Sequence, residues 1–587
     1  MAPHLVNVAM GRTAADMVIR RGRWVNVYSG EIIDNTDLAI LGGRFAWCGP
    51  NADHCIGPET EVVEAEGRYL VPGFCDGHMH VESGMVTVRE FCRAVIPHGT
   101  TTMFIDPHEI ANVLGLPGVK LMHDEALAMP VNVFVQMPSC VPSAPGLENA
   151  GASLGPDEIA EALQWENIVG LGEVMDFPGV AANTNRMVGA IAATMDAGKT
   201  VGGHYASPIL DRDFHAYAAG GPADDHEGTR KEDALARVRQ GMRAMLRLGS
   251  AWYDVKEQVR VLTEDGIDPR NLILCTDDCH SGTLVNDGHM NRVVRHAIEC
   301  GVPAITAIQM ATLNTAQHFG MERDIGSIAP GRRADFLLVD DLEKLTIESI
   351  YARGVQLAGN GVEKVEIAPF DYPASARNTI HMQRDLTAED FHIAAPEKAS
   401  EVRVRVIGVV ENQAPTKALE ATLPVRDGLV TGKDSICQIA LVERHRGTGG
   451  LVNAFVSGFN YSGKVAMAST VAHDSHHMIV IGTDHAQMAL AANRLRQVGG
   501  GVCFFSDGKE QALIEMPIAG LMSEEPCEVV AAKADQLTAA MQAAGCAMNN
   551  AYMQHSLLAL VVIPQLRISD EGLVDVRTFE KVDLFLD

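Results

Sequence analysis

The chain has 587 residues, 47% of them hydrophobic and 21% charged, so it can bury a large core and form two or three globular domains. Its 75 acidic residues outnumber its 47 basic ones, which gives a formal net charge of −28. This acidic excess argues against a nucleic-acid partner, which needs clustered Lys and Arg, and says little about a small neutral ligand.

Cysteine usage and hydropathy bear on location. The twelve cysteines include no C-x-x-C pair, which favours reduced thiols in a cytoplasmic protein. The N-terminal segment lacks the apolar run of a signal peptide, and no stretch of about 18 apolar residues follows it. We therefore expect an intracellular, cytoplasmic protein with no membrane partner.

Both flanks of the first two thirds of the chain carry short β patterns. Residues 14–70 alternate apolar strand-like runs with turn signals such as Gly42-Gly43 and Gly49-Pro50. A matching β segment returns at 326–340. We predict one small β-sandwich domain built from residues 1–70 together with 326–385.

Between the flanks, eight apolar strand-like runs alternate with helical patterns. They are residues 71–80, 101–107, 132–139, 168–174, 200–206, 220–228, 243–250 and 271–278, the sixth being the least regular. Eight β-then-α units over about 250 residues are typical of an α/β fold, the (β/α)8 barrel, whose catalytic groups lie at the C-terminal strand ends. We predict such a catalytic barrel over residues 71–325.

Polar residues stand where these strands end. They are His78, His80, Asp106, His108, Glu173, His204, His226 and Asp277. His78 and His80 should face the same side, because side chains along a strand repeat every two residues. A single one of these residues is readily explained as a helix cap or a rim residue. So many at equivalent positions predict one shared site.

The chain changes character near residue 400. Residues 366–400 carry Pro369, Pro373 and Pro396 and resemble a connection. An alternating pattern at 401–410 predicts a half-buried strand, and helical patterns follow at 484–498 and 526–545. We predict an α+β domain over residues 400–587.

The strand-end residues suit a metal site. Four histidines, Glu173 and Asp277 could hold one or two divalent ions of borderline hardness, namely zinc, manganese or ferrous iron. A site with an open coordination position lowers the pKa of bound water to about 7. An additional acid could move protons to a leaving group. This combination indicates a hydrolase acting on an amide, amidine or ester-like carbon.

Other catalytic templates are absent from the sequence. It contains no H-E-x-x-H and no G-x-x-x-x-G-K-[ST] motif. His80-Val81-Glu82 matches the H-x-E half of the cytidine-type deaminase signature, but the P-C-x-x-C half is missing.

Longer motifs carry a family resemblance. PGFCDGHMH at 72–80, GSIAPGRRADFLLVD at 326–340 and the strand-end series resemble the amidohydrolase superfamily. Within it, HMHVES at 78–83, PHGTTTM at 97–103, DPHEIANVLG at 106–115, GEVM at 172–175 and DHE at 225–227 resemble the adenine deaminase family. The likeness continues in ASTVAHDSH at 468–476, GGG at 499–501 and PIAGLMS at 517–523. It implies a metallo-hydrolase barrel that converts adenine to hypoxanthine and ammonia in purine salvage.

The resemblance also implies roles for the strand-end residues. His78, His80 and Asp277 would bind one metal ion, and His204 and His226 a second, both manganese or iron, with zinc possible. Glu173 would bridge the two ions, at the place where most superfamily members have a carboxylated lysine.

The remaining polar residues suggest proton transfers. We hypothesise that Asp277 accepts a proton from the attacking water and passes it to the departing ammonia. Glu109 would protonate a ring nitrogen of the purine. Asp106 and His108 would bind other purine edges or hold Glu109 in place.

Several local interpretations stay open. Asp106-Pro107 could be a simple turn with His108 capping the next helix. The cluster His473, Asp474, His476 and His477 could form a surface loop, a wall of the active site or an additional metal site. Arg247 could be an ion-pair partner or a substrate contact.

The overall function also has alternatives. Another aminopurine or a cyclic amide could be the substrate. A second alternative is a non-catalytic scaffold that kept the barrel, but such a protein would be expected to have lost some of the metal ligands, and here every predicted ligand position is filled. A small-molecule substrate and a homodimer are the expected partners.

Overall fold

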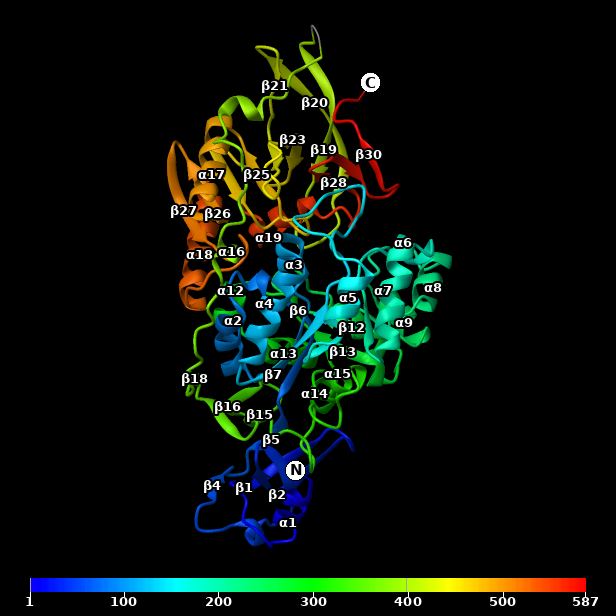
Figure 1. Ribbon diagram of the computed structural model, residues 1–587, viewed down its shortest axis with the longest axis vertical. Coiled ribbons are helices and arrows are strands. Elements are labelled where there is room, and N and C mark those ends of the chain that lie inside the picture. Colours follow the sequence, from blue (N-terminus) through cyan, green and yellow to red (C-terminus); the bar gives the residue numbers. More distant parts are fainter. Residues whose placement is uncertain (1, 397–398, 587) are drawn as a thin grey trace.

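The computed structural model describes residues 2–396 and 399–586. The molecule is elongated, with three parts stacked along its long axis (Figure 1). The sheet that contains the N-terminal strands lies at one end, the parallel strands lie in the middle, and the C-terminal domain lies at the other end. Met1 and Asp587, the outer limits of two predicted domains, are outside the described residues.

The two flanks form one nine-stranded sheet. Its strands are β1 (Met17–Asn26), β2 (Glu31–Leu41), β3 (Arg44–Gly49), β4 (Glu61–Glu64), β5 (Tyr69–Pro72), β15 (Phe336–Asp341), β16 (Thr346–Ala352), β17 (Val355–Gly359) and β18 (Val362–Glu363). Their order is β18-β17-β16-β15-β5-β1-β2-β3, with β4 beside β1. The antiparallel pairing of β5 with β15 joins the two flanks by backbone hydrogen bonds.

The central strands are parallel and form two arrays. They are β6 (Phe74–His80), β7 (Thr100–Ile105), β8 (Asn132–Met137), β9 (Ile168–Val174), β10 (Thr200–Gly203), β11 (Asp224–Asp225), β12 (Arg243–Arg247), β13 (Leu272–Cys275) and β14 (Asp277–Asp278). One array has the order β10-β9-β8-β7-β6-β14 and the other β11-β12-β13. Each of the eight predicted segments contains a strand, and the strand in the sixth segment, β11, has only two residues. Strands such as β7 and β8 are buried throughout, as expected for parallel strands covered on both faces.

The first predicted strand, 71–80, was wrong as a single element. Val71 and Pro72 belong to β5 of the flank sheet, whereas β6 begins at Phe74. The residue between them is Gly73, where a Cβ atom would lie 2.2 Å from the Thr101 hydroxyl oxygen. Because only glycine fits there, the chain can pass close to the neighbouring strand and change sheets.

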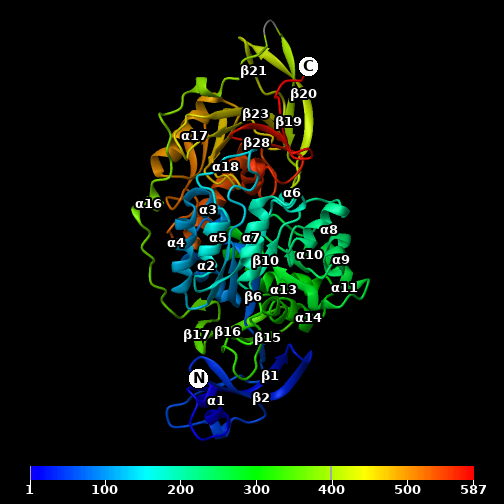
Figure 2. The same cartoon turned by 45° about the vertical axis from the view of Figure 1, so that its right-hand side comes forward.

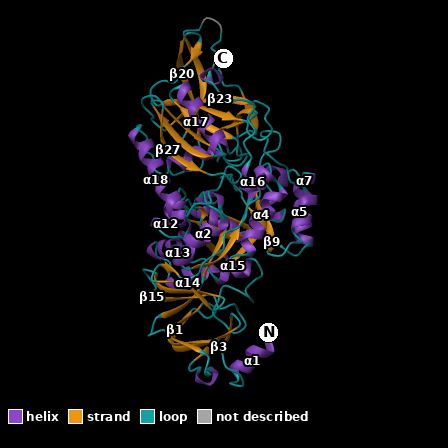
Figure 3. Ribbon diagram, turned by 60° about the vertical axis from the view of Figure 1, so that its left-hand side comes forward, coloured by secondary structure: helices purple, strands orange, loops and turns teal. Residues whose placement is uncertain are grey.

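Helices surround the parallel strands (Figures 2 and 3). In α13 (Met290–Glu299), Met290, Val293, Val294 and Ala297 are buried, the spacing of one helix face. The others are α2 (Val88–Val95), α3 (His108–Leu114), α4 (Leu116–Leu127), α5 (Pro156–Ala162), α6 (Phe177–Ala181), α7 (Asn185–Asp196), α8 (Arg212–Ala219), α9 (Lys231–Arg239), α10 (Val255–Gln258), α11 (Arg260–Thr263), α12 (Ser281–Asn286), α14 (Ala304–Met310) and α15 (Leu313–His318).

The C-terminal domain is built on a second nine-stranded sheet. Its strands are β19 (Glu401–Gly408), β20 (Lys417–Arg426), β21 (Leu429–Val430), β22 (Ile436–Val442), β23 (Leu451–Ser457), β24 (Val465–Ser469), β25 (Met478–Gly482), β26 (Gly501–Ser506) and β27 (Lys509–Glu515). A small sheet of β28 (Leu566–Ser569), β29 (Gly572–Asp575) and β30 (Glu580–Val582) lies beside it. β19 and the helices α17 (His485–Val498) and α18 (Cys527–Ala543) confirm the predicted strand and helices.

The remaining helical elements are short. They are α1 (Ala2–Ala9), α16 (Ala374–Arg377), α19 (Ala551–Ser556) and the 3₁₀ helices η1 (Asp53–Cys55), η2 (Glu82–Gly84), η3 (Ile96–His98), η4 (Pro269–Asn271), η5 (Ala388–Phe391) and η6 (Leu557–Ala559). Within the described ranges, no helix combines the length and apolar character needed to cross a membrane. All twelve cysteines carry free thiols.

Candidate functional site

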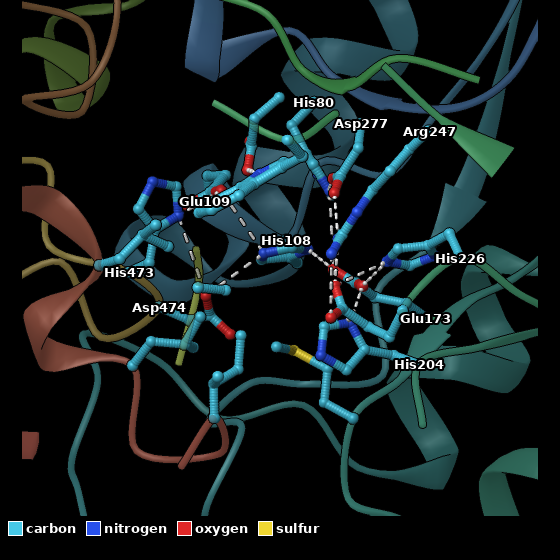
Figure 4. Close-up of a pocket in the computed structure, with 18 residues that line it drawn as sticks. His80, His108, Glu109, Glu173, His204, His226, Arg247, Asp277, His473 and Asp474 are labelled. Carbon is cyan, nitrogen blue, oxygen red and sulfur yellow. Dashed lines mark hydrogen bonds and ion pairs between the residues drawn. The ribbon is translucent and has the colours of Figure 1, made fainter. Parts of the chain in front are cut away.

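Six of the eight predicted strand-end residues line one buried cavity (Figure 4), namely His80, His108, Glu173, His204, His226 and Asp277. His78 and His80 lie on β6, and their ring centroids are 4.8 Å apart, as the alternation predicted. His226 follows β11, and its ring stacks on His78 at 4.1 Å. His204 follows β10, with its ring centroid 5.2 Å from that of His226. All four histidines are buried, each residue at most 4% exposed, so water does not screen the charges around them.

Glu173, the penultimate residue of β9, is at the centre of these histidines. Its Oε2 is 3.0 Å from His226 Nε2 and 2.5 Å from His204 Nδ1. The other carboxylate oxygen, Oε1, is 3.6 Å from His80 Nε2 and 3.1 Å from His108 Nδ1. Glu173 therefore faces both halves of the site at once.

Backbone groups orient two of the histidines. His80 Nδ1 lies 2.9 Å from the carbonyl oxygen of Asp106, so this nitrogen carries the proton and leaves Nε2 as a lone-pair donor. The backbone N–H of His204 donates to the Tyr217 hydroxyl at 2.7 Å, and that hydroxyl donates to the Val174 carbonyl at 2.8 Å. Tyr217 thereby links the ends of β9 and β10.

The donor set fits divalent metal ions. His78 and His204 each have a buried Nε2 that lacks a hydrogen-bond partner among the described residues. Donor atoms of His78, Glu173 and His226 lie within 4.8 Å of one another, and so do those of His78, His80 and Asp277. Orphaned imidazole nitrogens beside carboxylates are what a nitrogen and oxygen metal site requires.

The two carboxylate oxygens of Asp277, in β14, contact different residues of the site. Its Oδ1 is 3.3 Å from His80 Nε2, and its Oδ2 accepts a hydrogen bond from Arg247 at 2.7 Å. Arg247 also contacts Glu227 and donates to Asp254 at 2.7 Å, so it is an ion-pair partner of three carboxylates. Asp277 has φ of +60°, in the left-handed region that non-glycine residues rarely adopt, which is typical of functional positions.

Asp106 supports Glu173 from behind. Its Oδ2 accepts the backbone N–H of Glu173 at 2.8 Å, and its side chain does not line the cavity. The Asp106 carboxylate packs against Gly172, where a Cβ atom would lie 2.1 Å from Asp106 Oδ2. His108 begins α3, but its ring points to Glu173 and it does line the cavity.

The local charges keep the carboxylates ionised. Burial by itself raises the pKa of Glu173, but the adjacent His204 and His226 lower it well below its usual range. Burial also opposes ionisation of Asp277, and hydrogen bonding to His80 together with the charge of Arg247 lowers its pKa. Negative carboxylates inside a buried pocket favour cations as ligands.

The histidine-rich segment of the C-terminal domain also reaches this site. His473, Asp474, His476 and His477 are all at most 4% exposed, so the surface-loop interpretation is wrong. His473 and Asp474 line the cavity, and His473 Nδ1 is 2.8 Å from Glu109 Oε1. His473 and Asp474 therefore form a wall of the site opposite the strand ends, whereas His477 does not line the cavity.

Sequence reasoning missed several residues that line the cavity. Glu227 and Asp278 directly follow His226 and Asp277, and this adjacency to a predicted ligand was a signal for both. Glu227 also belongs to the DHE motif at 225–227, but no role was assigned to it from the sequence. Apolar side chains complete the walls, and no sequence pattern distinguishes them from ordinary core residues. They are Met175, Trp252, Ala414, Leu557, Leu560 and Ile563.

Comparisons with known proteins cover nearly the whole chain. The amidohydrolase family matches residues 69–382, and the adenine deaminase C-terminal domain matches residues 413–580. An adenine deaminase of Mesorhizobium japonicum is 72% identical over 100% of this chain and 97% of that protein. One of a Ruegeria species is 67% identical over 99% and 97%. A solved β-aspartyl dipeptidase of Fervidobacterium islandicum is 20% identical, with a TM-score of 0.46 over 60% of this chain and 99% of its own.

Proposed function

The chain belongs to the adenine deaminase family of the amidohydrolases, and we propose that its buried site hydrolyses adenine to hypoxanthine and ammonia. The main support is that His80, Glu173, His204, His226 and Asp277 come from five different strand ends and line one cavity. His78, on the same strand as His80, has its donor atoms within 4.8 Å of those of Glu173 and Asp277. The full-length similarity to proteins named adenine deaminase supports the substrate.

We assign the ligands as the family resemblance implies. His78, His80 and Asp277 would hold one divalent ion, His204 and His226 the other, and Glu173 would bridge them. Two such ions, manganese or ferrous iron with zinc as a further candidate, would supply hydroxide near neutral pH. The central position of Glu173 between both histidine pairs supports the bridging role.

Asp277 handles the proton of the attacking water. It accepts this proton as oxygen adds to C6 of adenine, and it then passes the proton to the amino group, which leaves as ammonia. Arg247 fixes one oxygen of the Asp277 carboxylate at 2.7 Å and so keeps the other directed at the reacting atoms.

Glu109 supplies the second proton. It protonates a ring nitrogen as the tetrahedral centre forms at C6, because the ring would otherwise carry a negative charge. When the C6 carbonyl forms, the proton lost by the new hydroxyl group restores the acid. Each turnover thus consumes one water and releases one ammonia. His108, whose Nε2 is 3.5 Å from Glu109 Oε1, would contact another edge of the purine, and Asp106 would position Glu173.

We also propose that the two strand arrays close into the predicted (β/α)8 barrel. The backbone N–H of Ala223 donates to the Val201 carbonyl at 2.8 Å, which links the segment before β11 to β10. Only Thr276 separates β13 from β14, so the eighth segment belongs to both arrays.

A sandwich shape for the flank sheet has similar support. The ring centroids of Phe45 on β3 and Phe336 on β15 are 5.9 Å apart, although three strands separate β3 from β15 in the sheet order. The sheet must therefore curl strongly to bring these two rings together.

A homodimer in the cytoplasm completes the proposal. Apolar side chains on the flank sheet, such as Ile32 and Val62, are both 41% exposed and offer a contact surface. Free thiols throughout fit a reducing compartment. Sedimentation of a monomer at micromolar concentration would contradict the dimer.

The decisive experiment measures ammonia release from adenine by metal-stripped protein reloaded with manganese, iron or zinc. We expect activity to plateau near two metal ions per chain, with no release from adenosine or guanine. Glu109→Gln should lower kcat by at least about 10²-fold at full metal content, the usual contribution of a general acid. Ammonia release from a different aminopurine or a cyclic amide, but not from adenine, would change the substrate assignment and leave the proposed metal site unaffected.

A further inference from the structure

We propose that His473 and His476, on the C-terminal domain, complete the acid at Glu109 and act as its positioning residues. This inference rests on the proposed function, in which Glu109 protonates the purine ring. It assigns the C-terminal domain a direct part in the reaction, although His473 follows Asp277, the last of the strand-end residues, by 196 positions in the sequence.

Each imidazole contacts a different oxygen of the carboxylate. His473 Nδ1 is 2.8 Å from Oε1, and His476 Nε2 contacts Oε2. Glu109 and His473 line the cavity, whereas His476 lies behind them. Oε1 is therefore the oxygen beside the substrate, and Oε2 is the anchored one.

The tautomer of His476 is set by its own loop. Its Nδ1 accepts the backbone N–H of Ala472 at 3.3 Å, so the ring proton is on Nε2 and is donated to Glu109. His476 has φ of +52°, a left-handed conformation that a non-glycine residue adopts only when its surroundings hold it.

A buried cation holds this loop in place. Arg444 is fully buried, and its Nε donates to the His476 carbonyl at 2.5 Å. Its other nitrogens donate to the carbonyls of Thr379 at 3.2 Å and Ala519 at 3.1 Å. Among the described residues, no carboxylate forms an ion pair with it. A buried arginine that binds only neutral partners is costly, so the loop geometry it fixes matters to the protein.

The charge distribution agrees with a shared proton. Burial alone raises the pKa of Glu109, but His473 and His476 lower it well below its usual range. Burial alone lowers the pKa of His473, but Glu109 raises it to about 9. Both shifts favour a charged pair, so the proton that Glu109 passes to the ring nitrogen is shared with His473 across the 2.8 Å contact.

The test compares kcat for His473→Gln and His476→Leu with the manganese-loaded wild type. We expect kcat to fall about 10–100-fold, as when a supporting partner is lost, while KM stays nearly constant. His476→Gln retains an N–H donor and should recover much of the activity. His477→Gln is the matched control, because His477 lies on the same loop but bonds to the Asn149 carbonyl, and its kcat should be unchanged.

The same substitutions are then made in Glu109→Gln. If the histidines act through Glu109, they should add little to the loss already caused by that change. Equal losses in both backgrounds, or wild-type kcat in properly metallated variants, would overturn the inference. So would a third metal ion per chain that disappears in His476→Leu. If that variant fails to fold, His473→Gln decides. A wild type that is inactive on adenine refutes the proposed function instead.

Discussion

Adding a methyl group at Gly172 tests how Glu173 is held. In Gly172→Ala, the new Cβ would lie 2.1 Å from Asp106 Oδ2 and 2.6 Å from its Cγ. Real Cβ atoms essentially never come within 3.0 Å of a non-bonded heavy atom, so the Asp106 carboxylate must retreat by about 1 Å. Asp106 is completely buried and has no free space to enter without disturbing its neighbours.

The cost has two parts. Overpacking a well-packed core costs about 1–3 kcal/mol. Losing the bond from the Glu173 N–H to a charged acceptor costs about 1.5–3 kcal/mol more. A displacement of Glu173 near 1 Å should also lower kcat/KM about 10²-fold, because the site depends on its position between the histidines.

The assay measures kcat/KM, bound metal and the thermal midpoint together. We expect all three to fall in Gly172→Ala. Asp106→Asn should lose less, because its amide oxygen can still accept the N–H. Gly282→Ala is the matched control, since its Cβ would be 3.5 Å from the nearest atom. Wild-type kcat/KM with full metal loading in Gly172→Ala would refute the idea that Asp106 positions Glu173.

Three further outcomes follow from buried groups. Burial lowers the pKa of His555 to about 3, so its contribution to stability is complete above the unfolded value of 6.5 and is lost as pH falls toward 3. The free energy of unfolding of His555→Leu should therefore rise relative to that of the wild type by about 1.4 kcal/mol for each pH unit below 6.5. The same difference in unfolding free energy between the two proteins at pH 7.5 and at pH 5 would disprove this. Tyr217→Phe leaves the His204 N–H unsatisfied, at a cost of about 1–3 kcal/mol, and should reduce bound metal measured by mass spectrometry, whereas full occupancy would count against it. Chelation should lower the melting temperature, because metal at 100 times its Kd stabilises by about 2.7 kcal/mol; an unchanged midpoint would argue against resident metal.

Local sequence patterns identified most of the site. Buried parallel strands have to be apolar, and the polar residue that ends each run is visible without a structure, as His80, Glu173 and Asp277 illustrate. The short sixth strand was recognisable mainly through His226, because two residues are too few to show an alternating hydrophobic pattern.

Patterns could not show which distant groups would meet. Arg247 ends an ordinary strand, and only the fold brings three carboxylates to it. The split of residues 71–80 between two sheets depends on the pairing of β5 with β15, more than 260 residues away along the chain.

By itself, the sequence determined the family, most of the strand-end residues that meet at the site and the principal helices, because each depends on residues close together in the chain. Only the tertiary structure decided that His473 and His476 are buried against Glu109, more than 360 residues away. A run of histidines has the polarity of a surface loop, and its burial becomes favourable only when partners such as Glu109 and Arg444 are brought to it. Periodicity reports which faces of an element are apolar, but long-range packing decides what covers them.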